Sequence, residues 1–309
     1  MPNEAKKLIK LCVYDLDDTL LEGNQAVREK ILDFSKGKTL VYSSARALKN
    51  VQQLINDKTL ITPDYCVCNN GLNIYKNLNG TLEEIKSWSK ELGEKFDKEP
   101  VRKIMTKLAK ENMFTKEDYA KMKLIEIPEG QKAFRGSKIT EYEVYGSPLN
   151  IYFMFAQGLF KKTLPTIEKQ LAKAGIEADV NFQNFTKEGL NLEKLKGYFP
   201  QGNIAKDMRN HALPRVNADG SIDVAIITAK GDKGKATEYI RKELGFNEKE
   251  IFAAGDGEND FTNTNKGYWF AFISNSTKGL KKLIGKNPPS NIIKTTKPGV
   301  KGIWEVLEP

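Results

Sequence analysis

The feature of this sequence that most constrains its fold is an alternation of short apolar runs with helical patterns, present at both ends of the chain but not in its middle. Near the start, apolar runs at residues 8–14, 38–43 and 64–69 are separated by two helical patterns, and an Asn79-Gly80 turn then predicts a hairpin. Runs of this length are typical of strands buried on both faces, and strands joined by helices form parallel βαβ units. The sequence therefore predicts an α/β fold, a parallel sheet with helices on both faces.

The same alternation returns at Gly231 and continues to the end of the chain. Between the two ends the chain is rich in lysine and glutamate, and helical patterns lie among scattered strands. We therefore predict one sheet domain formed by residues 1–81 and 229–309, with an α+β domain formed by residues 82–228 inserted into it.

The net charge of +9, from 49 basic and 40 acidic residues, raises the question of a nucleic-acid partner. The excess is spread along the chain, because residues 82–228 carry 24 basic and 21 acidic residues, or +3, and the rest carries +6. This spread disfavours nucleic acid as a partner. The polar, lysine-bearing N-terminus is unlike a signal peptide, and the longest apolar runs are too short to span a membrane. We therefore expect a soluble cytoplasmic protein with no membrane partner.

The chemistry open to the chain is limited by its few thiol and imidazole groups. Cys12, Cys66 and Cys68 are odd in number, lie in apolar segments and have a spacing poor for zinc, so we expect buried, reduced thiols. His211 is the single histidine, which excludes histidine-rich metal sites and disfavours a Ser-His-Asp triad. Any catalysis would depend on carboxylates, lysine and a hard metal ion.

Two pairs of aspartates follow predicted strand ends. Asp15 and Asp17 come directly after the first apolar run, and Asp256 and Asp260 follow a run at residues 251–254. Open α/β sheets place their ligand crevice at the carboxyl ends of the strands. Carboxylates this close need a bound cation or a shared proton, and each pair alone also suits an ordinary acidic turn. If the two strands are neighbours, the four oxygen-rich side chains suit Mg²⁺.

Two further residues are candidates for holding a phosphate. Ser44 leaves the second predicted strand just before a helix, where its hydroxyl and the nearby backbone N–H groups can bind an anion, although the same position suits a helix cap. Lys233 begins the helix predicted after Gly231 and would supply a fixed positive charge.

These segments together resemble a known family. Its motifs appear in order along the chain as Asp15-Leu16-Asp17-Asp18-Thr19-Leu20-Leu21, Ser44-Ala45-Arg46, Lys233-Gly234 and Gly255-Asp256-Gly257-Glu258-Asn259-Asp260. The set is similar to the four-motif signature of the haloacid dehalogenase superfamily, and most similar to the Cof-type sugar-phosphate phosphatases, with sucrose-phosphate phosphatase as a relative. The resemblance implies a Rossmann-like core with an inserted C2-type cap. Asp18 stands where the family usually has glycine, and Ser-Ala-Arg replaces the common Thr-Gly-Arg.

The resemblance also implies a role for each motif residue. Asp15 would be the nucleophile that forms an aspartyl-phosphate, and Asp17 would be the general acid and base. Mg²⁺ would be held by Asp15, Asp17 and Asp256, with Asp260 in support. The phosphate-binding residues would be Ser44, Lys233 and Asn259. The implied activity is that of a Mg²⁺-dependent phosphomonoesterase for a small phosphorylated metabolite such as a sugar phosphate.

Alternatives to the phosphatase stay open at this point. A phosphomutase would use the same aspartyl-phosphate and pass the phosphoryl group to a second hydroxyl, whereas a phospho-receiver would keep it. We expect a monomer or a small homo-oligomer, and the sequence does not distinguish the two. It also does not identify the residues that set substrate specificity. Candidates in the insert are Arg135, Arg209, His211 and Arg215, although each is better explained as an ordinary surface residue.

Overall fold

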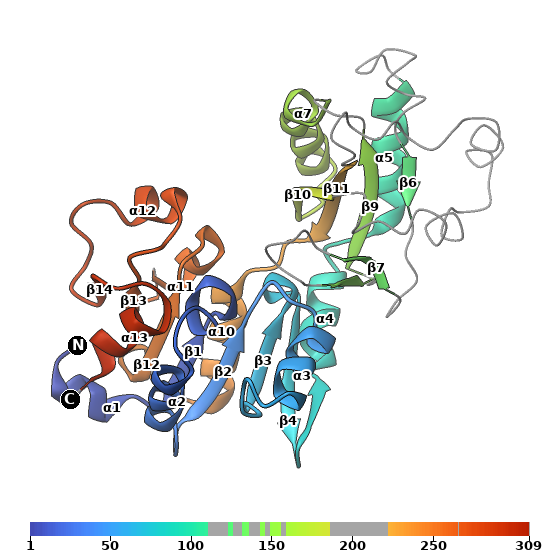
Figure 1. Ribbon diagram of the computed structural model, residues 1–309. Coiled ribbons are helices and arrows are strands. Elements are labelled where there is room, and N and C mark those ends of the chain that lie inside the picture. The colour runs from blue at the N-terminus through green and yellow to red at the C-terminus, as the bar shows by residue number, and fades with distance from the viewer. Residues whose placement is uncertain are drawn as a thin grey trace. The chain divides into compact units, whose positions relative to one another are not determined.

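The computed structural model of the chain describes residues 1–110, 123–125, 132–135, 143–145, 149–155, 159–185, 222–264 and 266–308 (Figure 1). The chain divides into two compact units, Met1–Trp88 with Gly231–Pro309, and Ser89–Lys230. The first unit continues past residue 81 because the strand after the Asn79-Gly80 turn pairs back onto its sheet.

An eight-stranded sheet forms the centre of the first unit, in the order β14-β13-β12-β1-β2-β3-β4-β5. The strands are β1 Leu11–Tyr14, β2 Thr39–Ser43, β3 Tyr65–Cys68, β4 Asn73–Leu78, β5 Thr81–Glu84, β12 Ile251–Gly255, β13 Trp269–Phe272 and β14 Ile292–Lys294. All pairs from β14 to β3 are parallel, whereas β4 pairs antiparallel with both β3 and β5. The predicted parallel α/β core is therefore confirmed, and the predicted hairpin forms one edge of its sheet.

Helices cover both faces of this sheet. They are α1 Asn3–Leu8, α2 Gln25–Phe34, α3 Leu48–Asn56, α10 Lys233–Leu244, α11 Phe261–Thr264, α12 Lys278–Ile284 and α13 Gly299–Leu307, while α4 Lys86–Gly93 begins in this unit. Alternate strand side chains such as Cys12, Tyr14 and Tyr42 pack with α2, α3 and α13 in one core. α10 buries Ala236 and Ile240 and contacts β3. The three cysteines are free and buried, as expected.

The first strand is shorter than the apolar run at residues 8–14 predicts. Leu8 is the last residue of α1 and is 55% exposed, and β1 begins only at Leu11. From Leu11 to Tyr14 every side chain is buried, because β1 lies between β2 and β12. Leu8 instead belongs to a polar segment of good helix formers that buries only Ala5.

The second unit is built differently. Its sheet has the order β10-β11-β9-β6, all antiparallel, and a separate ribbon pairs β7 with β8. Its described elements are α5 Lys98–Lys110, β6 Lys123–Ile125, β7 Lys132–Arg135, β8 Glu143–Tyr145, β9 Asn150–Phe155, α7 Leu159–Lys173, β10 Ala178–Phe185 and β11 Ile222–Ala229. This unit has the α+β character that the sequence predicts for the insert.

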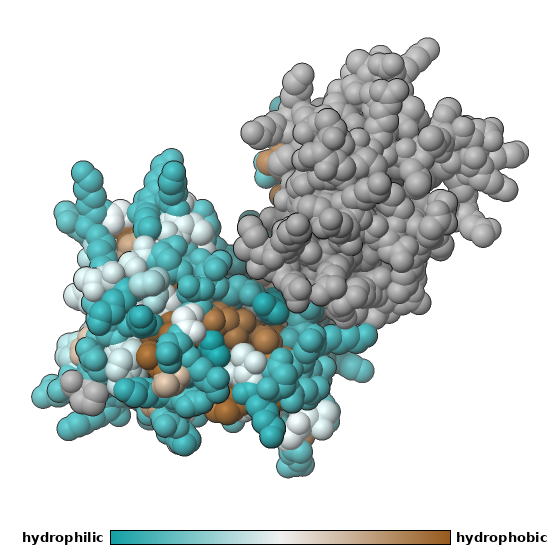
Figure 2. All heavy atoms as spheres, in the orientation of Figure 1, coloured by the Kyte–Doolittle hydropathy of each residue, from teal (hydrophilic) through white to brown (hydrophobic). Residues whose placement is uncertain are grey.

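Hydrophilic residues cover most of the visible face of the first unit, with a smaller hydrophobic area between them (Figure 2). The large hydrophobic side chains described as exposed are Leu8, Ile61, Leu78 and Leu283, which lie in or beside four different elements. Within the described ranges, no helix combines the length and the apolar character that crossing a membrane requires.

Candidate active site

The two acidic segments meet because their strands are neighbours. β1 and β12 pair in parallel with Tyr14 opposite Ala254, and the Asp15 N–H donates to the Ala254 carbonyl at 3.0 Å. The ladder thus continues one residue beyond β1 and holds Asp15 beside the loop that carries Asp256. This edge of the sheet is where parallel α/β folds place a ligand.

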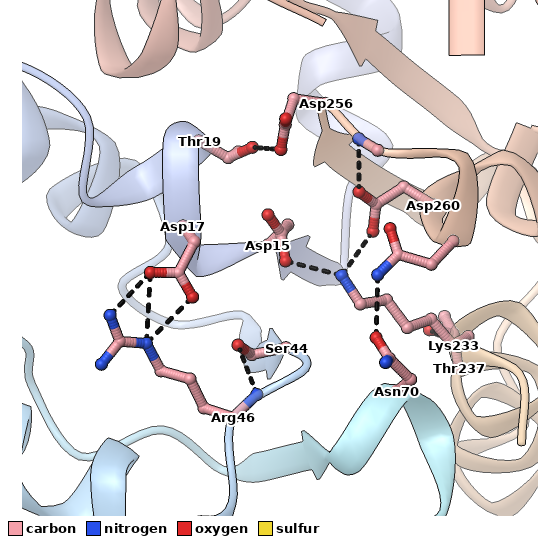
Figure 3. A network of polar contacts seen from close by, with 12 residues as sticks. Asp15, Asp17, Thr19, Ser44, Arg46, Asn70, Lys233, Thr237, Asp256 and Asp260 are labelled. Carbon is pink, nitrogen blue, oxygen red and sulfur yellow. Dashed lines mark hydrogen bonds and ion pairs between the residues drawn. The ribbon is translucent and has the colours of Figure 1, made fainter. Parts of the chain in front are cut away.

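A buried ion-pair network lies at the centre of the site (Figure 3). The Lys233 ammonium contacts Asp15 Oδ1 at 2.6 Å and Asp260 Oδ1 at 2.9 Å. Asp15 is 6% exposed and the other two residues are 2% exposed. Burial alone would lower the pKa of Lys233, but the charges of the two aspartates outweigh burial and raise it above its usual value. Lys233 is therefore a fixed cation in this site.

Local structure places both Lys233 and Asp260. Asp232 caps α10 by accepting from the Lys235 N–H at 2.9 Å, which starts the helix directly at Lys233. Asp260 packs against the end of β12, where a Cβ added to Gly255 would lie 2.4 Å from the Asp260 carboxyl carbon. Glycine is needed at residue 255 because any side chain would displace this carboxylate.

The three carboxylates of Asp15, Asp256 and Asp260 form a cluster suited to a divalent cation. Each offers an oxygen, and these oxygens all lie within 4.8 Å of one another. Burial, with the neighbouring charge of Asp260, raises the pKa of Asp256 to about 6, and burial raises the pKa of Asp15 well above its usual value. Three carboxylates and the Lys233 ammonium have a net charge of −2 when all are ionised. The donor set and its charge fit Mg²⁺.

Asp17 lies outside this cluster and has a different partner. Arg46 Nε and Nη2 donate to its carboxylate, with a shortest distance of 2.6 Å from Nη2 to Oδ1. The Arg46 N–H also donates to Ser44 Oγ at 3.1 Å. Arg46 therefore orients both Asp17 and Ser44. Sequence reasoning assigned no role to Arg46, although it completes the Ser44-Ala45-Arg46 motif.

The structure explains the usual glycine at residue 18. Asp18 has a φ of 53°, in the left-handed region that glycine adopts without strain and aspartate tolerates better than most residues. The Asn275 side chain donates to the Asp18 carbonyl at 2.7 Å and holds this conformation. Beside it, Thr19 donates to Asp256 Oδ1 at 3.0 Å and ties the first motif to the fourth.

The remaining predicted residues are not part of this ion-pair network, or lie outside the residues that the structure describes. Ser44 is 1% exposed at the end of β2, whereas Asn259 is exposed and donates to Asn70 Oδ1 at 2.8 Å. Arg209, His211 and Arg215 lie outside the described residues, and of Arg135 only the backbone, in β7, is described. The structure thus brings Asp15, Asp256, Asp260 and Lys233 into direct association, and does not include Asp17 or Asn259 in it.

Comparison with known proteins gives a family and a fold. The family model described as sucrose-6F-phosphate phosphohydrolase matches residues 8–124 and 204–308, well over half of the chain. No curated protein matches the sequence.

Several solved structures are similar over almost the whole chain. Sucrose-phosphatase from Synechocystis sp. PCC6803, solved with sucrose and phosphate, is 17% identical with a TM-score of 0.60, and the match covers 96% of each chain. The haloacid dehalogenase-like hydrolase yhjK from Bacillus subtilis is 18% identical with a TM-score of 0.57, covering 97% of this chain and 91% of that one. A haloalkanoate-superfamily phosphatase from Bacteroides thetaiotaomicron is 16% identical with a TM-score of 0.53, covering 100% and 97%. At these identities the likeness shows the fold.

Proposed function

Because the chain belongs to the sucrose-6F-phosphate phosphohydrolase family and is a phosphatase of the haloacid dehalogenase superfamily, we propose that it hydrolyses a small sugar phosphate through an aspartyl-phosphate on Asp15. The observation that carries this proposal is the buried Asp15 carboxylate, 2.6 Å from Lys233, in a cluster with two further carboxylates. A nucleophile for a phosphate ester must meet a negatively charged substrate, and this cluster has the charge to hold the cation that makes the approach favourable.

The first step is the attack of the Asp15 carboxylate on phosphorus. Lys233 engages Asp15 Oδ1, and Oδ2 attacks phosphorus in line with the departing ester oxygen. The new bond joins Oδ2 to phosphorus, and the bond between phosphorus and the ester oxygen breaks. The Lys233 ammonium offsets negative charge on the transferring group, and the Ser44 hydroxyl donates to one of its oxygens, because the Arg46 N–H already occupies an acceptor position of Ser44 Oγ.

The second residue of the motif moves the proton. Asp17, acting as the acid, gives a proton to the leaving alkoxide and then, acting as the base, takes one from the water that attacks the aspartyl-phosphate. Hydrolysis releases inorganic phosphate and restores the Asp15 carboxylate. The Asp17 side chain is 27% exposed, so a bound alcohol and a water molecule can both approach it.

Asp15, Asp256 and Asp260 are the side chains that would hold Mg²⁺. The Asp17 carbonyl would be a further ligand in this proposal. When bound, the ion would supply Lewis-acid charge to the phosphoryl group. Thr19 orients Asp256 through its hydrogen bond at 3.0 Å, and the Gly257 N–H orients Asp260 through one at 3.1 Å.

The proposed substrate class rests on the family and on a similar fold. The matched family is described by a sugar-phosphate substrate, and the similar Synechocystis enzyme was solved with a sugar and phosphate. We expect the residues that recognise the sugar to lie in the inserted unit, acting as a cap, since the residues assigned above all serve the phosphoryl group.

A panel of phosphate esters tests the proposal. Release of inorganic phosphate is measured with Mg²⁺ for sucrose-6F-phosphate, several hexose 6-phosphates and 4-nitrophenyl phosphate. We expect the highest kcat/KM for a sugar phosphate and no release in excess chelator. Equal values for all esters would contradict a sugar-phosphate specificity. Conversion of a hexose phosphate to its isomer without phosphate release would instead indicate a phosphomutase.

A further inference from the structure

The turn after β3 has an unusual backbone. Asn69, Asn70 and Gly71 have φ angles of 51°, 56° and 93°, three consecutive residues in the left-handed region. Such residues are strained unless they are glycine, and asparagine is one of the few others that tolerate the conformation. We refer to Asn69–Gly71 as the asparagine turn.

The chain contains a second Asn-Gly pair with nearly the same backbone. Asn79 and Gly80 have φ angles of 55° and 91° in the β4–β5 hairpin. A Cβ added to Gly80 would have no atom within 4 Å, whereas one added to Gly71 would lie 2.5 Å from the Asp232 backbone. Gly80 of the hairpin therefore has open space beside it, whereas Gly71 of the asparagine turn packs against Asp232, the residue that caps the Lys233 helix.

The asparagine turn also contacts the two other loops of the site. Its backbone N–H groups donate to the second motif, from Asn69 to the Arg46 carbonyl at 2.9 Å and from Asn70 to the Ser44 carbonyl at 3.1 Å. Its Asn70 side chain accepts from Asn259 Nδ2 at 2.8 Å (Figure 3). Three loops, carrying Ser44, Lys233 and Asn259, therefore meet on one short segment.

Side-chain hydrogen bonds also hold the asparagine turn on the neighbouring strands and helix. The Trp88 indole N–H donates to the Gly71 carbonyl at 2.9 Å, and Asn69 Nδ2 donates to Asn73 Oδ1 at 2.9 Å. Asn73 in turn donates to Glu84 Oε1 at 2.8 Å. These contacts fix the turn on β4, β5 and α4, so that the Asn70 amide is the part that faces the site.

We propose that Asn70 is a positioning residue of the phosphatase site, which holds the Asn259 amide where it binds the phosphoryl group. The inference rests on the proposed function and on the phosphate-binding role that the family resemblance implies for Asn259. Asparagine suits this position because a short side-chain acceptor and tolerance of a left-handed backbone are needed together, and glycine supplies only the second.

The variant Asn70→Gly separates these two requirements, because it keeps the backbone and removes the amide. Asn79→Gly is its matched control, with the same substitution at the same φ outside the site. We expect Asn70→Gly to raise KM and the inhibition constant of inorganic phosphate by about 3- to 10-fold, the effect of one lost hydrogen bond, with kcat changed less. We expect Asn79→Gly to leave both constants unchanged.

A double-mutant cycle tests whether Asn70 acts through Asn259. In an Asn259→Ala background, Asn70→Gly should have no further effect on phosphate binding, since the amide that it positions is gone. Equal effects of Asn70→Gly in both backgrounds, or no effect in the wild-type background, would overturn the proposal. Calorimetric titration of these variants with inorganic phosphate gives the same test without turnover. The role of Asn70 can therefore be tested even if the protein hydrolyses no sugar phosphate, a result that would contradict the proposed function alone. A wild-type protein that binds no phosphate would overturn both.

Discussion

Asp15 and Asp17 are two residues apart in one motif, and their surroundings are opposite. Asp15 is buried beside Lys233, and burial raises its pKa well above the usual value. Asp17 is partly exposed and bound by Arg46 through two nitrogens. The difference arises because Asp15 still belongs to the ladder of β1, whereas Asp17 has left it. One motif thereby provides a desolvated nucleophile and an accessible group for proton transfer.

The largest expected effect comes from removing the nucleophile. Asp15→Asn keeps the shape of the side chain and removes the charge that attacks phosphorus, so we expect kcat to fall by about 10⁴-fold or more. The measurement is phosphate release from the best substrate of the panel. The far-ultraviolet circular dichroism spectrum serves as the control for folding. A folded variant with substantial activity would show that Asp15 is not the nucleophile.

A smaller and substrate-dependent effect is expected at Asp17. Asp17→Asn removes the proton donor, and we expect kcat for a sugar phosphate to fall by about 10²- to 10⁴-fold. The loss should be smaller for formation of the intermediate from 4-nitrophenyl phosphate, whose leaving group departs without a proton. This difference is measured as the burst of 4-nitrophenol in rapid-mixing experiments. An equal loss of the burst and of sugar-phosphate turnover would contradict the role of Asp17 as an acid.

The two basic partners should differ in what they contribute to stability. Lys233→Met leaves buried carboxylates without their cation, and we expect the free energy of unfolding to drop by about 3–5 kcal/mol in chelator. Arg46→Met removes the partner of a partly exposed carboxylate, and we expect a loss of about 1 kcal/mol or less. Urea unfolding of both variants makes the comparison. Equal losses would show that Asp15 and Asp17 do not differ in burial as described.

The smallest expected effect is on the pH dependence of Mg²⁺ binding. Asp256 has a pKa of about 6 before the ion binds, so a proton competes with the metal as the pH falls through this value. Calorimetric titration should give a dissociation constant about fourfold higher at pH 5.5 than at pH 7.5, with any protonation of Asp15 adding to this ratio. The Asp17→Asn variant should show the same ratio, because its side chain lies outside the cluster. An unchanged constant would contradict the carboxylate cluster as the metal site.

Much of the fold could be predicted from sequence pattern alone. Helix Lys233–Leu244 begins at the predicted residue, because Asp232 caps its start, and it ends where Gly245 takes a left-handed conformation. The family resemblance drawn from the four motifs is confirmed by the matched family model. The run at residues 8–14 predicts a single strand, whereas β1 begins at Leu11, because hydrophobicity alone does not separate the end of a helix from the start of a buried strand.

The contacts between motifs could not be predicted in the same way. Arg46 and Asn70 have no distinctive spacing relative to Asp17 and Asn259, and they meet them only through the order of strands in the sheet. A pattern along the chain predicts which residues leave strand ends. It does not predict which of those side chains bind one another, because that depends on register and on backbone conformations such as those of Asp18 and Asn70.

The proposed mechanism depends on phosphorylation of Asp15 during turnover. The most direct test mixes the Asp17→Asn variant, in which hydrolysis of the intermediate is slowed, with substrate carrying a radiolabelled phosphoryl group, and quenches the reaction in acid within one turnover. Peptide mass spectrometry and radioactivity then locate the label. We expect a phosphoryl group on the peptide that contains Asp15, and none in the Asp15→Asn variant. Label on another residue, or phosphate release with no labelled protein at any time, would contradict it.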